Sequence, residues 1–182
     1  MKDIIAYFLT DLKAIDYGIS FIVGIVLFAG YILYIKFYKK QTFTVQNVLL
    51  GIVFAGYIAI LFGGTILNRE MGEEYQMKLR PFWSYQVVIE YKDYSMLWQI
   101  VSNVLVFIPW GFLSAKLWDG MKKFGWNLYC SFMLSVIIEG TQLVCKFGLF
   151  ELDDILHNVL GAVIGYMIWR LWNKITSNRK RE

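Results

Sequence analysis

Residues 137–166 are mostly apolar enough to sit in lipid, yet they carry acids and amides that can exchange protons or form hydrogen bonds. Among them are two amides and three acids: Glu139, Gln142, Asp153, Asp154 and Asn158. A carboxylate in hydrocarbon costs about 2.5–3.5 kcal/mol on insertion scales, so such a charge marks a site. Paired carboxylates can act as general acid and base when burial raises the pKa of one of them, and they can also bind a polar head group. The stretch therefore predicts a polar site within or beside a membrane.

Helical spacing gathers these side chains on two helix faces. One face carries polar residues at steps of four, three and four positions: Ser135, Glu139, Gln142 and Lys146. The other combines polar residues with a pair of glycines: Asp154, Asn158, Gly161 and Gly165. The glycine pair has the small-residue spacing that lets membrane helices approach closely, so we expect helix packing through Gly161 and Gly165.

The acidic residues also have purely structural interpretations. Asp153 and Asp154 open a helix, where free N–H groups and the positive end of the helix dipole favour carboxylates. Glu139 could form a buried ion pair with Arg69, Arg80 or Lys146 that holds helices together without chemistry. The residue pattern leaves these interpretations open beside binding or catalysis.

The sequence lacks the residues that several common kinds of catalytic and binding site require. His157 is the only histidine, which argues against a histidine-rich zinc site and a Ser-His-Asp triad with a spare base. No glycine loop of the phosphate-binding kind follows a strand, so no nucleotide or other cofactor is predicted. A divalent cation held by Glu139, Asp153 and Asp154 is an alternative, since hard cations prefer oxygen ligands, but we predict a site without metal.

The elements that position these residues are membrane-spanning helices. Of 182 residues, 58% are hydrophobic, well above the share in soluble domains. We predict an all-α polytopic membrane bundle, residues 17–173, with about five transmembrane helices. The predicted spans are 17–37, 45–67, 97–118, 124–146 and 153–172. Residues 1–16 repeat apolar side chains at helical spacing, which predicts an amphipathic helix at the membrane surface.

The distribution of Lys and Arg predicts the orientation. The ends of the odd-numbered spans are basic, with three groups of residues: Lys36, Lys39 and Lys40; Lys116, Lys122 and Lys123; Arg170, Lys174, Arg179, Lys180 and Arg181. Because basic connections stay in the cytoplasm, the N-terminus is expected outside and the C-terminus inside a bacterial plasma membrane. The polar residues, including Asn103, then gather near the outer leaflet.

Two segments flank this bundle. The long connection 68–96, which contains Arg69 and Arg80, is expected to form an ordered outer cap at the membrane interface. The basic tail 174–182 lies beside the membrane and favours anionic lipid, so membrane lipids and not nucleic acid are the expected partners.

Four motifs resemble the VanZ-like membrane family in order and spacing. They are LRPFWSY (79–85), NVLVFIPWGFL (103–113), IIEGTQL (137–143) and FELDDILHNVLGAVIGY (150–166). The resemblance covers residues 65–166. It implies a small helical membrane protein of Gram-positive cell envelopes, and the founding member of the family is tied to reduced susceptibility to teicoplanin, a lipid-tailed glycopeptide.

The resemblance also implies a set of functional positions. The family's recurring polar positions map onto Arg69 or Arg80, Asn103, Glu139, Gln142, Asp153 or Asp154, and Asn158. Many relatives carry an arginine shortly before the acidic pair, whereas this chain reads GLFE at 148–151. A mechanism that needs a basic residue at that point is therefore not expected here.

Three functions fit these observations. The first is a cell-envelope protein whose outer polar pocket binds an amphiphile, a lipid head group or a lipoglycopeptide. The second is an intramembrane enzyme acting on a lipid-linked or cell-wall substrate through Glu139 and Asp153 or Asp154. The third is a structural or partner-binding membrane protein in which polar side chains join helices.

Overall fold

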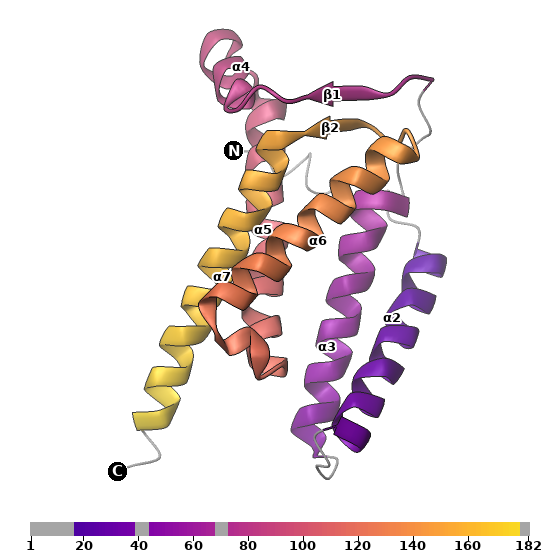
Figure 1. Ribbon diagram of the computed structural model, residues 1–182, viewed down its shortest axis with the longest axis vertical. Coiled ribbons are helices and arrows are strands. Elements are labelled where there is room, and N and C mark those ends of the chain that lie inside the picture. The colour runs from indigo at the N-terminus through magenta and orange to yellow at the C-terminus, as the bar shows by residue number, and fades with distance from the viewer. Residues whose placement is uncertain (1–16, 39–43, 68–72, 179–182) are drawn as a thin grey trace. The chain divides into compact units, whose positions relative to one another are not determined.

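The computed structural model describes residues 17–38, 44–67 and 73–178 (Figure 1). The described part is almost entirely helical, which confirms the prediction of an all-α fold. Its residues group into two compact units that divide between residues 70 and 71. The predicted surface helix 1–16 and Arg69 lie outside the described residues.

The first unit is a pair of helices. It contains α2 (Tyr17–Leu33), extended by the π-helical segment η1 (Tyr34–Tyr38), and α3 (Val45–Phe62), extended by η2 (Gly63–Leu67). Thr44 caps α3, since its hydroxyl accepts a hydrogen bond from the N–H of Asn47 at 3.2 Å. Small residues let the helices approach: a Cβ on Gly24 would lie 3.2 Å from the carbonyl oxygen of Ala55.

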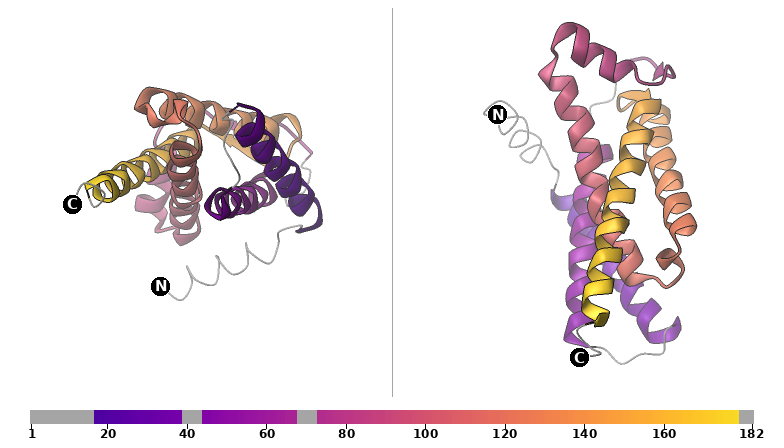
Figure 2. Two further views of the ribbon diagram at one scale, coloured as in Figure 1. Left: turned by 90° about the horizontal axis from the view of Figure 1, so that it is seen from below. Right: turned by 90° about the vertical axis from the view of Figure 1, so that its left-hand side faces the viewer.

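The second unit is a bundle of three long helices with a small cap. In chain order its elements are β1 (Gln76–Lys78), α4 (Trp83–Tyr91), α5 (Tyr94–Leu117), the 3-10 turn η3 (Gly120–Lys122), α6 (Phe124–Val144), β2 (Leu149–Glu151) and α7 (Leu152–Asn178). Helices α5 and α7 lie side by side and run in the same direction, while α6 runs back between them in the chain (Figures 1 and 2). Helix α5 continues without interruption through Pro109.

Glycines bring the backbones of α5 and α7 into contact. A Cβ on Gly161 would lie 2.1 Å from the carbonyl oxygen of Val104, and one on Gly165 would lie 1.9 Å from that of Ile108. Gly111 approaches the backbone of α7 in the same way. Since both partners advance by four residues, the two helices are parallel and aligned turn for turn.

The connection before α5 is ordered in a way that the sequence pattern does not indicate. Strand β1 pairs in parallel with β2, with Met77 opposite Phe150 and Lys78 opposite Glu151. Helix α4 follows, and Asp93 caps α5 by accepting the N–H groups of two residues in its first turn. This pairing holds Glu151 at the end of the unit that carries α4, called the α4 end below.

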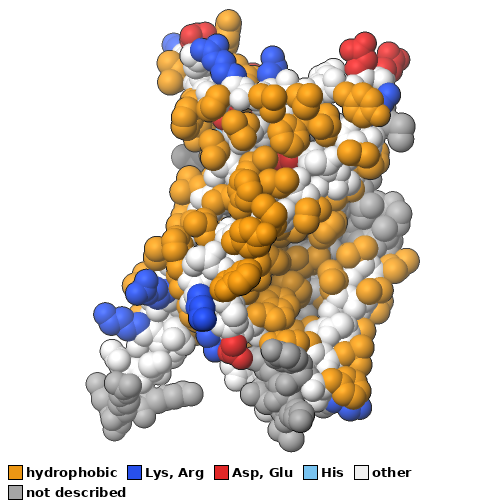
Figure 3. All heavy atoms as spheres, in the orientation of Figure 1, with side chains coloured by type: hydrophobic (Ala, Val, Ile, Leu, Met, Phe, Trp, Pro, Cys, Tyr) orange, Lys and Arg blue, Asp and Glu red, His pale blue; other side chains and the backbone are white. Residues whose placement is uncertain are grey.

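A helix lies at each of the five predicted spans, but the bounds of α5, α6 and α7 differ from the prediction by up to six residues, and α6 is not among the helices that can cross a membrane by length and composition. By length and composition three helices of the described chain can cross a membrane, Val45–Ile66, Tyr94–Leu117 and Leu152–Asn178, and Ile22–Phe37 is a shorter apolar helix. On the unit of residues 73–178, apolar side chains cover most of the visible face, and charged side chains collect toward its two ends (Figure 3). Helix α7 extends to Asn178, so residues 174–178 of the predicted tail are helical.

Candidate functional site

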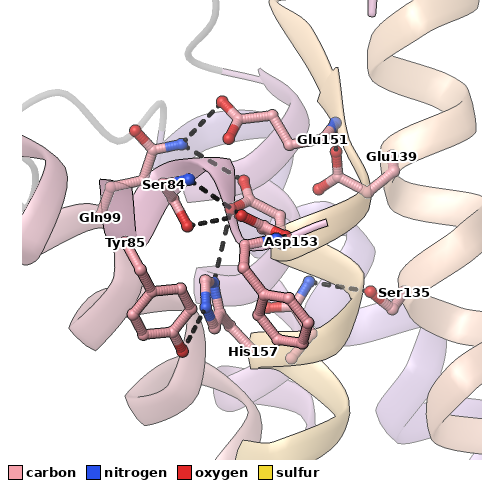
Figure 4. Close-up of polar contacts among 11 residues, drawn as sticks. Ser84, Tyr85, Gln99, Ser135, Glu139, Glu151, Asp153 and His157 are labelled. Atoms are coloured by element: carbon pink, nitrogen blue, oxygen red, sulfur yellow. Dashed lines mark hydrogen bonds and ion pairs between the residues drawn. The ribbon is translucent and has the colours of Figure 1, made fainter. Parts of the chain in front are cut away.

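Four acidic side chains gather at the α4 end, where β2 leads into α7 (Figure 4). Glu139 comes from α6, Glu151 from β2, and Asp153 and Asp154 from the first turn of α7. All four are buried, with at most 6% of each residue exposed. Because unpaired buried charge is costly, the partners of these groups define what each one does.

Asp153 stabilises the cap. Its carboxylate accepts hydrogen bonds from the N–H of Phe82 at 2.6 Å, the N–H of Ser84 at 3.0 Å and the hydroxyl of Ser84 at 2.6 Å. These donors belong to the start of α4, so Asp153 caps a helix about 70 residues away and not the first turn of its own helix. A carboxylate that already accepts three hydrogen bonds has a structural role.

Asp154 faces a different set of groups. The amide of Gln99 on α5 donates to Asp154 Oδ2 at 3.4 Å and to Glu151 Oε1 at 3.1 Å. The N–H of Glu151 in turn donates to Glu139 Oε2 at 3.3 Å. Three carboxylates from three elements are therefore joined through one amide side chain and one backbone N–H.

The single histidine of the chain lies in the same region. His157 is 2% exposed, and its Nε2 lies 2.9 Å from the phenol oxygen of Tyr85 on α4. Its Nδ1 lies 3.9 Å from Asp154 Oδ1 and has no hydrogen-bond partner among the described residues. The imidazole thus stands between a buried carboxylate and a tyrosine that is 39% exposed.

A polar face extends from this cluster along the whole of α6. It consists of buried residues at steps of four and three: Asn127, Ser131, Ser135, Glu139 and Gln142. Asn158 on α7 donates to the hydroxyl of Ser135 at 2.9 Å. Nearer the other end, the indole N–H of Trp110 donates to Ser131 at 3.0 Å, and Asn127 donates to Ser114 at 2.9 Å. These bonds join α6 to both of its neighbours.

The predicted site residues differ in burial. Glu139, Gln142, Asp154 and Asn158 are buried along the packed faces of α6 and α7. Asn103 lies one turn beyond Gln99 on α5, and its Nδ2 is buried with no hydrogen-bond partner in the described chain. Arg80 is exposed.

The expected position of Lys146 on the polar face of α6 is wrong. Helix α6 ends at Val144, and Lys146 adopts a left-handed conformation with φ of 55°. Its side chain donates to the carbonyl oxygen of Glu73 at 2.8 Å and lies 4.9 Å from the ring centroid of Tyr75. It therefore joins the cap to the end of α6.

Sequence reasoning did not single out several polar residues at the α4 end: Ser84, Tyr85, Gln99, Glu151 and His157. The signal available for Tyr85 was its place in the motif at 79–85, and for His157 it was helical spacing, three residues after Asp154. Glu151 had the same kind of signal as Tyr85, since it lies in the motif at 150–166. Gln99 had none, because its contacts depend on how α5 packs against β2 and α7. Among the described residues no group of three or more His, Cys, Asp or Glu side chains is arranged to hold a metal ion.

Comparison with known proteins assigns the family. The family model described as VanZ/LLP1 matches residues 21–173. The chain is also similar to Protein VanZ of Enterococcus faecium, with 28% identity over 85 residues that cover 45% of this chain and 50% of that protein. The chain thus matches about half the length of this curated relative, and no solved structure matches it significantly. Since the match to the family model includes all three long helices of the bundle and the buried acidic cluster, this apolar helical chain belongs to the VanZ/LLP1 family.

Proposed function

We propose that this protein is a cell-envelope membrane protein whose polar cluster at the α4 end binds the polar head of an amphiphile or lipid. By its family resemblance, such binding would lower the susceptibility of the cell to lipid-tailed glycopeptides of the teicoplanin type. The cluster consists of Tyr85, Gln99, Glu139, Glu151, Asp154 and His157, and Asp153 beside it holds the start of α4 in place.

The observation that carries this proposal is the placement of the cluster. Buried carboxylates, an imidazole and an amide meet at one end of helices whose outer surfaces are apolar. Asp154 and His157 lie three residues apart on one face of α7, with Asp154 Oδ1 3.9 Å from His157 Nδ1, and Tyr85 of α4 contacts the other ring nitrogen. A polar head would contact the cluster while its tail follows the apolar exterior of the bundle.

Drug susceptibility tests this function. A susceptible Gram-positive host expressing the chain is expected to tolerate more of a lipid-tailed glycopeptide but no more of a tail-less one. Glu139→Ala and Asp154→Ala should remove the protection at equal membrane abundance, because loss of a charged hydrogen-bond partner weakens binding about tenfold. Glu90→Ala, which removes an exposed carboxylate on α4, is the matched control. Equal protection against both drugs, or no effect of the two variants, would contradict the proposal.

We also propose that the α4 end faces outward, as the basic residues predict. In a chain with Cys130→Ala and Cys145→Ala, a cysteine introduced by Glu73→Cys should react with a membrane-impermeant thiol reagent on intact cells. A cysteine introduced by Asp119→Cys, at the opposite end of α5, should react only after permeabilisation. Both positions are exposed, so accessibility alone does not distinguish them. The reverse result would place the polar cluster in the cytoplasmic leaflet.

A second candidate function is acid-base catalysis on a lipid-linked or cell-wall substrate. The observation in its favour is the Asp154, His157 and Tyr85 arrangement, in which an imidazole contacts a partly exposed phenol. Glu139→Gln distinguishes the two functions, since an amide cannot transfer the proton of a carboxyl but still fills its volume. Complete loss of function in this variant favours an enzyme, whereas partial retention favours head-group binding.

A further inference from the structure

Within the buried part of the cluster, the side-chain amide and hydroxyl donors are bound to carboxylates of the protein. Both hydrogens of the Gln99 amide point to carboxylates, and the hydroxyl of Ser84 donates to Asp153. The indole N–H of Trp83 and the amide of Asn103 have no described partner, but both nitrogen atoms are buried. Tyr85, which is 39% exposed, is therefore the member of the cluster that a ligand at the surface would contact.

The carboxylate next to His157 favours one of the two possible directions for the hydrogen of the Tyr85 phenol. Asp154 Oδ1 is 3.9 Å from Nδ1, and a carboxylate favours a proton on the nearer nitrogen. With the proton on Nδ1, Nε2 carries a lone pair and accepts the O–H of Tyr85 at 2.9 Å. The phenol then has no hydrogen left to donate, and its oxygen can only accept.

The ring of Phe82 lies next to the ring of Tyr85. Phe82 and Tyr85 have ring centroids 6.2 Å apart with planes tilted by 54°, and both residues are exposed. Aromatic faces attract cations, including ammonium groups, within about 6 Å of the ring centroid. Acceptor oxygen, aromatic faces and the Asp154 carboxylate behind the imidazole all favour a positively charged hydrogen-bond donor.

We infer that the ligand is an amphiphile with an ammonium head, and that Tyr85 is its contact residue. An N–H of the head donates to the phenol oxygen, and the head rests against Phe82 and Tyr85. His157 is a positioning residue, since it acts through the Tyr85 hydroxyl. This inference rests on the proposed function above and names the class of its ligand.

The tautomer of His157 can be measured directly because the chain has one histidine. Protein labelled with ¹⁵N-histidine in maltoside micelles should give one imidazole, with a protonated Nδ1 and an unprotonated Nε2. Asp154→Asn should shift the proton population toward Nε2, which a merely structural role of His157 would not require. A wild-type imidazole with its proton on Nε2 would overturn the inference, because Tyr85 would then be free to donate.

Binding is tested with three probes that share one tail: dodecylammonium, dodecanol and dodecyl phosphate. Dodecylammonium should shift the His157 resonances saturably and bind about tenfold more tightly than dodecanol, as expected for a charged hydrogen bond. Tyr85→Phe keeps the ring but removes the oxygen, and should remove most of this advantage. Tyr91→Phe, on the same helix and 75% exposed, should leave it unchanged.

The outcomes separate this inference from the proposed function. Tighter binding of dodecyl phosphate, whose head exposed Arg80 and Lys78 could attract, would overturn the ammonium assignment and keep an amphiphile site. Equal effects of Tyr85→Phe and Tyr91→Phe would overturn Tyr85 as the contact residue. If no probe shifts the imidazole resonances, both the ligand class and the amphiphile site are wrong.

Discussion

A Gly165→Ala variant is expected to lose about 3 kcal/mol of its free energy of unfolding, a large effect for one added methyl group. The new Cβ would lie 1.9 Å from the carbonyl oxygen of Ile108 and 3.0 Å from the N–H nitrogen of Phe112. Both are backbone atoms of α5, so no side chain can rotate away and the helices must separate. Separation would weaken packing along the whole α5 and α7 interface. Unfolding of the purified protein in micelles, by heat or by denaturing detergent, measures the change.

Gly140→Ala is the matched control for this prediction. Gly140 lies inside α6, and a Cβ there would meet no atom within 4 Å. The same substitution should leave stability unchanged or raise it by about 0.5–1 kcal/mol, because alanine is the better helix former. Equal destabilisation by both substitutions would contradict the prediction, because the close approach of α5 and α7 would then not account for the loss at Gly165.

Asp153→Ala is expected to destabilise the protein by about 3–4 kcal/mol, since each buried donor left without a partner costs about 1–3 kcal/mol. Asp153 is fully buried, and the substitution removes the acceptor of two N–H groups and one hydroxyl at the start of α4. The cap should then detach from α7. Protease sensitivity within 76–93, together with the unfolding midpoint, measures both effects.

Two substitutions with smaller expected losses of unfolding free energy serve as comparisons for Asp153→Ala. Asp93→Ala removes an ordinary helix cap at the start of α5 and should cost about 1 kcal/mol. Ser84→Ala removes one of the three donors to Asp153 and should cost a similar amount, about 1 kcal/mol. An Asp153→Ala effect no larger than these two would mean that Asp153 does not stabilise the cap.

The two neighbouring aspartates therefore have different expected phenotypes. Asp153→Ala should lower the amount of folded protein, whereas Asp154→Ala should leave the fold intact and remove ligand binding. The distinction follows from their partners: Asp153 accepts three hydrogen bonds from α4, while Asp154 faces Gln99 and His157. Binding experiments on Asp154 variants can thus be interpreted without loss of the cap.

Much of the architecture was predictable from local patterns. The number and approximate positions of the long helices follow from long apolar runs, because about 20 residues cross the hydrocarbon layer. The buried face of Ser135, Glu139 and Gln142 on α6 followed from their spacing alone. The position of Lys146 was wrong because periodicity does not reveal where a helix stops, and α6 ends two residues earlier in a left-handed turn.

By itself, the sequence determined that this protein is an all-α bundle of apolar helices and that Glu139, Gln142, Asp154 and Asn158 are polar groups inside it. Only the tertiary structure decided which aspartate is structural and which groups join the cluster. Gln99 and Tyr85 reach α7 across 55 and 72 residues of chain. Adjacent helical side chains point about 100° apart, so the neighbours of Asp153 and Asp154 depend on how α4 and α5 pack. Helical periodicity predicts which face of a helix a residue occupies, but the packing of the helices determines which residues that face contacts.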